Sequence, residues 1–289
     1  MVPEARPDAP AGVGLGAWPA LAASICREVR RVPFAIDGVT VGSVAEVHLD
    51  ALRGWPQALR VNASRVQLMA ADRDAALASV NAALREQGLI VAWRDETYAV
   101  VERLGAPPFA LIERAAARFW GTLTFGAHAN GYVADAAGRP THLWIARRAL
   151  SKATDPGKLD NLVGGGVPFG QTPFETLVRE GFEEAGLSAE LMRRAVPGRV
   201  IELACDIVEG FMHEQLHSFD LHLPADVTPI NQDGEVAELR CLPVAEAIEL
   251  ATGDTMTVDA ALVTLDFALR HRLLGGDEHA RLAALLPLA

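Results

Sequence analysis

Cysteine is scarce in this chain, with three residues, Cys26, Cys205 and Cys241, in a total of 289. Disulfide-stapled secreted domains carry an even set of closely spaced cysteines, and three distant ones do not make such a framework. We therefore expect reduced thiols that pack in the core of a cytoplasmic protein.

An excess of basic charge and long apolar runs are also missing. The chain has 26 Lys and Arg against 37 Asp and Glu, a formal net charge of −11, and no basic run. This charge argues against nonspecific nucleic-acid binding. There is no 18-residue apolar span, and the N-terminus lacks the basic and apolar regions of a signal peptide. We expect a soluble protein without nucleic-acid or membrane partners.

What is present is ample material for a core, since 50% of the residues are hydrophobic. The length suits two domains better than one. Residues 1–16 are rich in Pro, Ala and Gly, which predicts a mobile arm. Pro107 and Pro108 are the best linker, so we predict a small α+β domain over residues 17–107 and a second domain over 108–289.

Hydrophobic patterning predicts the elements of both domains. In the first domain we expect a helix over 18–29, a hairpin over 34–44 that turns at Asp37 and Gly38, a strand over 60–69, a helix over 72–86 and a strand-like alternation over 89–101. In the second we expect a short helical run near 113–117, strands over 125–134, 142–147, 162–167, 199–208, 215–223 and 238–242, and helices over 172–186, 244–252 and 258–274. This order predicts a mixed sheet with helices on both sides.

The helix over 172–186 has the strongest boundary signals in the chain. Thr172, Pro173 and Glu175 supply an N-cap hydroxyl, a proline at the first helical position and a capping-box carboxylate, and Gly186 ends the helix. Its apolar positions share one face and predict packing against a sheet. They are Phe174, Leu177, Val178, Gly181 and Ala185.

Glu180, Glu183 and Glu184 of this helix stand at i, i+3 and i+4, which places them on one face where they would converge on one point. Such close carboxylates repel one another unless a cation lies between them. Oxygen ligands suit Mg²⁺ or Mn²⁺, and the absence of Cys and His from the helix argues against zinc. The alternative is a solvated acidic face balanced by Arg179.

The spacing around these residues closely resembles the Nudix box. From Gly165 the chain runs five residues to Gln171, then seven residues to Arg179 and the run REGFEEAGL. Two positions depart from the Nudix pattern: Gln171 replaces a glutamate and keeps only a hydrogen-bonding role, and Gly181 replaces an aliphatic residue and would permit close approach of the helix to the sheet.

Further segments resemble one branch of the Nudix superfamily, which has an extra N-terminal domain and includes the Nudix part of fungal thiamin pyrophosphokinase fusions. They are the ERAA run at 113–116, GAHANGYV at 126–133, LWIARR at 143–148, SKATDPGKLDNLVGGG at 151–166, PINQDGEV at 229–236 and DFALRH at 266–271. This resemblance implies an α/β fold, a Nudix α/β/α sandwich with a mixed sheet preceded by a small α+β domain. It also implies a magnesium-dependent hydrolase of small organic diphosphates, with thiamin diphosphate or its oxidised analogues as candidate substrates.

The match to the box assigns Glu180, Glu183 and Glu184 as metal ligands and Arg179 as the group that orients a glutamate. The chemistry expected is attack of water on phosphorus, with metal ions that offset charge on the phosphate oxygens. The general base is Glu183 or Glu235 of the DGEV run, and the alternative for Glu235 is a surface acid beside a turn.

Cations for the diphosphate are expected from Arg147, Arg148 and Lys152, although adjacent strand residues point to opposite faces and one arginine should only meet solvent. The Gly164–Gly166 triplet, with Gly165 in the box, permits backbone approach to the metal and phosphates. His128 and Asn130 are candidates for the substrate pocket, and a buried, hydrogen-bonded histidine is the alternative for His128.

Three other functions stay open. An isopentenyl diphosphate isomerase would need a reactive cysteine before the box, and residues 123–153 contain none. A catalytically silent Nudix fold that binds a ligand is favoured by Gln171 and Gly181 but not by the intact acidic residues. An interaction protein whose acidic helix binds only bulk cations is the third. The oligomeric state is open, with a homodimer as one option.

Overall fold

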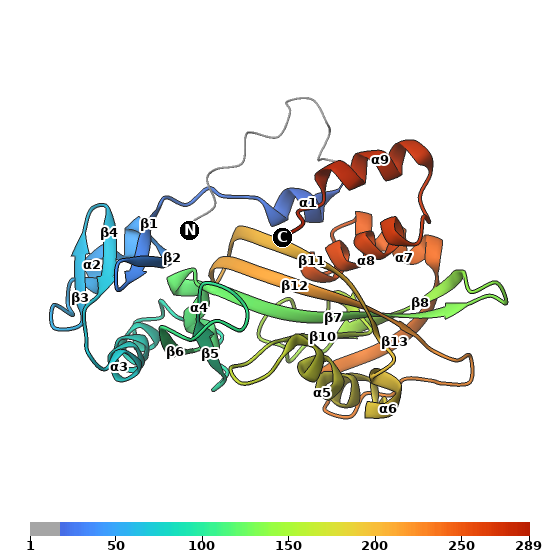
Figure 1. The fold of residues 1–289 in the computed structure, drawn as a ribbon, viewed down its shortest axis with the longest axis horizontal. Coiled ribbons are helices and arrows are strands. Elements are labelled where there is room, and N and C mark those ends of the chain that lie inside the picture. The colour runs from blue at the N-terminus through green and yellow to red at the C-terminus, as the bar shows by residue number, and fades with distance from the viewer. Residues whose placement is uncertain (1–17) are drawn as a thin grey trace.

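The computed structural model describes residues 18–289, so the arm predicted at residues 1–16 lies outside the described residues. Two units lie side by side (Figure 1). We call residues 31–120 the N-terminal unit, and residues 121–289, together with a short helix at 19–24, the large-sheet unit.

The N-terminal unit is a four-stranded sheet of order β2-β1-β4-β3, a two-stranded sheet of β5 and β6, and the helices that pack on them. Its core contains Phe34 and Trp120, whose ring centroids are 4.4 Å apart, and the Trp120 indole donates to Oδ1 of Asn81 at 2.8 Å. The elements are β1 Arg31–Ile36, β2 Val39–Ala45, η2 Glu46–His48, α2 Leu49–Leu52, β3 Leu59–Asn62, β4 Arg65–Leu68, α3 Arg73–Glu86, β5 Thr97–Val100, β6 Ala110–Glu113 and α4 Arg114–Trp120.

The predicted hairpin that turns at Asp37 and Gly38 is confirmed by β1 and β2. The single strand predicted over 60–69 is wrong, because the chain reverses there into the hairpin of β3 and β4. Oδ1 of Asn62 accepts from both the backbone N–H and the hydroxyl of Ser64 at 2.9 Å. This Asx turn provides a local hydrogen-bonding alternative that the apolar pattern does not reveal.

Two further predictions were too long. The alternation over 89–101 forms a strand only at β5, because Ala92 and Asp95 adopt left-handed backbone with φ of 58° and 59°. The helix predicted over 18–29 is the short α1, Pro19–Ser24. Beyond it, the backbone N–H groups of Glu28 and Val29 donate to Oδ2 of Asp206 at 2.7 and 2.8 Å, which holds the chain in a non-helical path.

The large-sheet unit is built on a seven-stranded mixed sheet with the main order β11-β12-β7-β8-β13. β12 runs parallel to β7, whereas β10 pairs antiparallel with β7 and β9 with β8. Its strands are β7 Leu123–Ala134, β8 Pro140–Arg148, β9 Leu159–Asn161, β10 Val163–Gly166, β11 Val196–Ile207, β12 Gly210–His222 and β13 Val236–Pro243.

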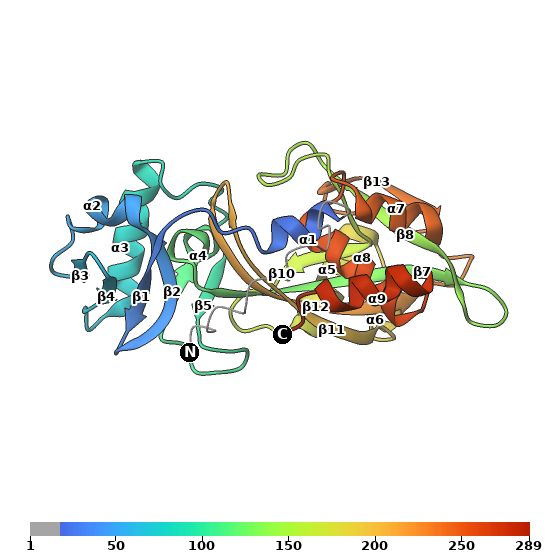
Figure 2. The ribbon, with the colours of Figure 1, turned by 90° about the horizontal axis from the view of Figure 1, so that it is seen from above.

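Helices cover both faces of this sheet, as Figures 1 and 2 show, and this confirms the predicted α/β sandwich. α5 and α6 pack on one face. On the other face α8 lies in the core, with α1, α7 and α9 around it. The helices are α5 Pro173–Ala185, α6 Ala189–Met192, α7 Val244–Thr252, α8 Val258–Arg270 and α9 Gly276–Leu285.

Two short helices pack across the predicted boundary at residue 107. Leu21 of α1 and Trp18 just before it lie in the core around α8, and α4 contributes Phe119 and Trp120 to the core of the N-terminal unit. The division of the chain at residue 107 stays a prediction.

The three cysteines are free, and Cys205 is buried as expected. The expectation that all three lie in the core is wrong for Cys241, which is exposed on β13. Within residues 18–289 no helix is both long and apolar enough to cross a membrane.

Candidate active site

The helix α5 begins and ends as its sequence predicts. The Thr172 hydroxyl accepts from the backbone N–H of Glu175 at 3.2 Å, and the Glu175 carboxylate accepts from the backbone N–H of Thr172 at 2.8 Å. Gly186 adopts left-handed backbone with φ of 64° at the other end. This reciprocal cap fixes the direction of the helix and therefore of the acidic side chains in its last two turns.

Glu184 is almost fully buried against β10. Its Oε2 accepts from the backbone N–H of Gly164 at 2.9 Å. Burial, and next the negative charge of Glu180, raise the pKa of Glu184 well above its ordinary value. A buried carboxylate beside another acid is a position at which a cation would relieve both desolvation and repulsion.

Glu180 lies one turn earlier, beside Gly165. A Cβ atom on Gly165 would stand 2.5 Å from Oε1 of Glu180, so glycine is needed for this carboxylate to occupy its place. Burial raises the pKa of Glu180, and the positive charge of Arg179 opposes that rise.

Arg179 connects two of the three acidic side chains. Its guanidinium donates to Oε1 of Glu180 at 2.7 Å and to Oε2 of Glu183 at 2.6 Å. Arg179 was expected to orient a glutamate; it bonds to two of them here, and its role in the reaction stays a prediction. Arg179 supplies, in this conformation, the positive charge between carboxylates that a metal ion would otherwise supply.

The expectation that all three glutamates converge on one point is not met in this conformation. Arg179 holds Glu180 and Glu183, whereas Glu184 turns to Gly164. In the part of the chain that the structure describes, no three His, Cys, Asp or Glu side chains are arranged to hold a metal ion. The donor chemistry nevertheless fits a divalent cation, because the carboxylates are hard oxygen ligands and Gly165 leaves room for one of them.

The two departures from the box have local explanations. Oε1 of Gln171 accepts from the Thr176 hydroxyl at 3.0 Å and from Nε of Arg179 at 3.5 Å, which is the hydrogen-bonding role predicted for it. Gly181 does lie on the buried face. Its close neighbour is Met192 of α6, whose Sδ would be 2.5 Å from a Cβ, and not the sheet as predicted.

A cavity of about 590 Å³ opens beside this helix, between the two units. The Gly164–Gly166 strand forms one side, so the wall of the cavity is also the backbone against which Glu180 and Glu184 lie. The segment 91–94 of the N-terminal unit contributes another side. Further residues come from α4, the β8–β9 loop, the β11–β12 hairpin and the start of α8.

Five arginine and lysine side chains line this cavity, and four of them have an acidic partner. Arg114 bonds to Glu96 at 2.7 Å and Arg148 to Asp160 at 2.8 Å. The remaining pairs are Arg118 with Glu214 and Lys158 with Asp155. Arg94, the fifth, has no carboxylate within 4.0 Å among the described residues.

Three of the predicted substrate-binding residues line the cavity: His128, Arg148 and Gly165. His128 is also buried, with Nδ1 at 3.0 Å from Oδ1 of Asn161. It therefore both lines the cavity and is a buried, hydrogen-bonded histidine, the alternative considered for it.

The other three lie elsewhere. Arg147 is half-exposed on the opposite side of β8, where it donates to the carbonyl of Gly157 at 3.0 Å, in agreement with the strand argument that separated it from Arg148. Lys152 pairs with Glu235. Asn130 is buried in the interior, where its amide group donates to the carbonyl of Val263 at 3.3 Å.

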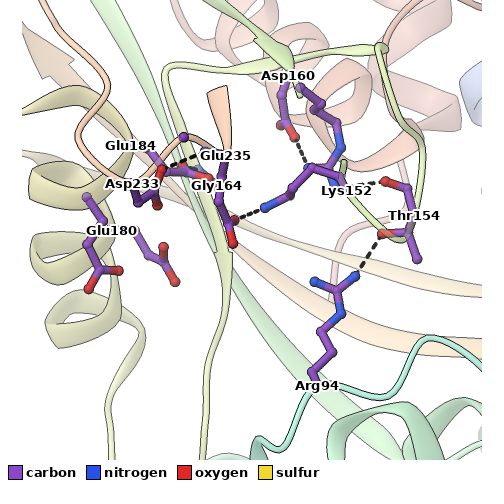
Figure 3. A network of polar contacts seen from close by, with 12 residues as sticks. Arg94, Lys152, Thr154, Asp160, Gly164, Glu180, Glu184, Asp233 and Glu235 are labelled. Carbon is purple, nitrogen blue, oxygen red and sulfur yellow. Dashed lines mark hydrogen bonds and ion pairs between the residues drawn. The ribbon is translucent and has the colours of Figure 1, made fainter. Parts of the chain in front are cut away.

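Neither candidate general base is free in this conformation. Glu235 is bound to Lys152, and Glu183 to Arg179. The backbone N–H of Gln232, just before the DGEV run, donates to the carbonyl of Glu183 at 2.9 Å, so this run lies at the acidic end of α5, where Figure 3 draws Glu184 and Glu235.

Arg94, Arg114 and Arg118 were not predicted as site residues. Arg114 and Arg118 stand at i and i+4, so they lie on the same face of the helix. This spacing could have suggested that both line one cavity. Nothing local marks Arg94, because only the packing of the two units brings it to the cavity.

The fold and the acidic helix define an α/β/α protein of the Nudix class. Residues 124–260 match the family model described as NUDIX domain, and residues 20–124 match one described as a domain of unknown function, DUF4743. Over 149 residues the chain is 32% identical to the uncharacterized Nudix hydrolase orf19 of Rhodococcus erythropolis, across 50% of this chain and 75% of that protein. The chain belongs to the Nudix hydrolase family.

A second relative is Nudix hydrolase 24, chloroplastic, of Arabidopsis thaliana, which is 41% identical over 204 residues. The match covers 70% of this chain and 55% of that protein, so the chain spans about half of its length. Among solved structures, the chain is similar to DR0079 from Deinococcus radiodurans at 24% identity and a TM-score of 0.43, over 59% of this chain and 97% of that one.

Proposed function

We propose that this protein is a metal-dependent hydrolase that cleaves the diphosphate linkage of a small organic diphosphate. The observation that carries the proposal is the placement of Glu180 and Glu184 against the Gly164–Gly165 backbone, which is at the same time a wall of a cavity rich in arginine. The cavity has the size of a small-molecule site.

Nudix hydrolases generally use divalent metal ions. Here Glu180, Glu183 and Glu184 would hold the ion, and we propose magnesium or manganese from the all-oxygen ligand set. When bound, the ion supplies positive charge that offsets charge on the phosphate oxygens and makes water a better nucleophile. Release of Glu180 and Glu183 from Arg179 would free these carboxylates for that role. Glu183 or Glu235 would then accept the proton of the attacking water.

The finer substrate assignment is thiamin diphosphate or its oxidised analogues, and it rests on the resemblance to thiamin pyrophosphokinase fusions. A cytoplasmic location and a homodimer likewise remain predictions.

The test is release of phosphate and monophosphate from a panel of diphosphates, with and without magnesium. The panel contains thiamin diphosphate, its oxo and oxy analogues, nucleoside diphosphate sugars and dinucleoside polyphosphates. We expect magnesium-dependent turnover that falls at least 100-fold in Glu184→Gln, whereas Glu249→Gln, an exposed acid on α7, keeps the wild-type rate. Turnover that persists in Glu184→Gln would refute the assigned site.

A catalytically silent ligand-binding module is the second candidate, and the bonds from Arg179 to Glu180 and Glu183 favour it. Ligand binding without turnover on any member of the panel would establish this candidate instead.

A further inference from the structure

Arg94 differs from the other cations of the cavity in what surrounds it. Its guanidinium donates to the hydroxyl of Thr154 at 3.2 Å, in the loop between β8 and β9 (Figure 3). Among the described residues it forms no ion pair, although Arg114, Arg118, Arg148 and Lys158 each do. Arg94 therefore contributes net positive charge to the cavity.

The surroundings of Arg94 disfavour its positive charge. Burial, followed by the positive charges of Arg114 and Arg148, lowers the pKa of Arg94, and the negative charges of Glu235 and Glu96 oppose this only in part. A guanidinium that is partly buried among like charges is stabilised by an anion, and a planar guanidinium suits the oxygens of a phosphate group.

The position of the cavity indicates which anion this is. Gly164–Gly166 form a side of the cavity, and Glu180 and Glu184 of α5 pack against this same short strand. A diphosphate in the cavity would therefore have the acidic helix near one part of it and Arg94 near another. The opposed charges match a substrate that is held by arginine on one side and by a carboxylate-bound cation on the other.

We propose that Arg94 binds a phosphate group of the substrate, so that the N-terminal unit, which matches a family without assigned function, supplies part of the diphosphate site. The proposal rests on the proposed function for its substrate class. It adds that the N-terminal unit is a substrate-binding element of this active site.

The experiment measures binding of methylenediphosphonate, a diphosphate analogue that cannot be hydrolysed, to the full chain in the presence of magnesium, by calorimetry. We expect Arg94→Gln to weaken binding at least 10-fold and Arg94→Lys to weaken it less than Arg94→Gln does, because lysine retains the charge but not the planar guanidinium geometry. The matched control is Arg60→Gln, an exposed arginine on β3 of the same unit, which should bind as the wild type does.

The Thr154→Ala variant distinguishes two roles of Arg94, binding of the phosphate group and a purely structural hydrogen bond between the units. It removes the hydrogen-bond partner of Arg94 but keeps the cation. We expect its affinity to fall clearly less than that of Arg94→Gln, because the cation that binds the phosphate group is still present. Equal affinity in Arg94→Gln and wild type, an equal loss in Thr154→Ala, or no binding by the wild type would each overturn the proposal. Turnover on the panel is measured separately, so failure of the hydrolase function and failure of this proposal are distinguishable.

Discussion

At the scale of single residues, Gly165 shows how strictly the site depends on the absence of a side chain. A Cβ there would be 2.5 Å from Oε1, 2.6 Å from Cδ and 2.7 Å from Cγ of Glu180. All three contacts are shorter than van der Waals distance. A side chain at position 165 would therefore displace the whole side chain of Glu180 and break its hydrogen bond with Arg179.

We therefore predict that Gly165→Ala reduces metal-dependent turnover at least 10-fold and weakens stabilisation by magnesium, because it displaces Glu180. The measurement is initial rate together with the rise in melting temperature on addition of magnesium. Gly276→Ala at the start of α9, where a Cβ would meet nothing within 4 Å, is the control. A Gly165→Ala protein with wild-type metal response would contradict the assigned role of Glu180.

Asp259 is a second residue with a measurable signature. It lines the cavity at the start of α8, and burial, with the charge of Glu214 next in importance, raises its pKa to about 6. The pKa of Asp259 in the folded state lies above its unfolded-state value of about 3.9. The stability that protonated Asp259 gives to the fold is therefore fully present below about pH 3.9 and is lost as the pH rises through about 6.

We predict that Asp259→Asn becomes more stable relative to the wild type, by about 1–3 kcal/mol, as the pH rises from 4 to 7. Urea denaturation at several pH values gives the difference. Asp254→Asn, an exposed neighbour, serves as the control. A difference between Asp259→Asn and wild type that does not change with pH would show that the Asp259 carboxyl has an ordinary pKa.

At the scale of elements, the sequence predicted α5 well because the signals for this helix are local. The capping box, Gly186 and the apolar face of α5 all lie within a few residues of the atoms that they position, and the structure has each of them. The strand predicted over 60–69 failed for a local reason, the Asx turn at Asn62, whereas the length of the first helix depended on a distant contact. Asp206 on β11 holds Glu28 and Val29 in a non-helical path, and no feature of residues 18–29 reveals that partner.

The cap of α5 gives an element-scale prediction. Thr172→Ala removes one half of the capping box, and we expect a loss of about 1 kcal/mol in the free energy of unfolding. Thr228→Ala, at an exposed loop position, should change it by less than about 0.5 kcal/mol. Equal urea midpoints for the two variants would mean that the cap contributes nothing to stability.

At the scale of the whole molecule, the acidic half of the site was accessible from the sequence, whereas the cationic half was not. Glu180 and Glu184 share one helix with a long motif, so spacing alone located them. Arg94 reaches the cavity only because the N-terminal unit packs beside the large sheet, and Arg114 and Arg118 only because α4 packs with that unit. The ion pairs of Arg147 with Glu238 and of Lys152 with Glu235 were likewise not accessible from the sequence, because their acidic partners lie on β13 and in the loop before it.

The most direct test of the account is hydrolysis in ¹⁸O-labelled water of the panel member that the protein cleaves fastest, followed by mass spectrometry of the products. We predict magnesium-dependent incorporation of ¹⁸O into a phosphate-containing product, because the proposed reaction is attack of water on phosphorus. The label should fall to background in Glu184→Gln and stay at the wild-type level in Glu249→Gln. Absence of turnover on every diphosphate, or cleavage with no label in the phosphate, would contradict the account.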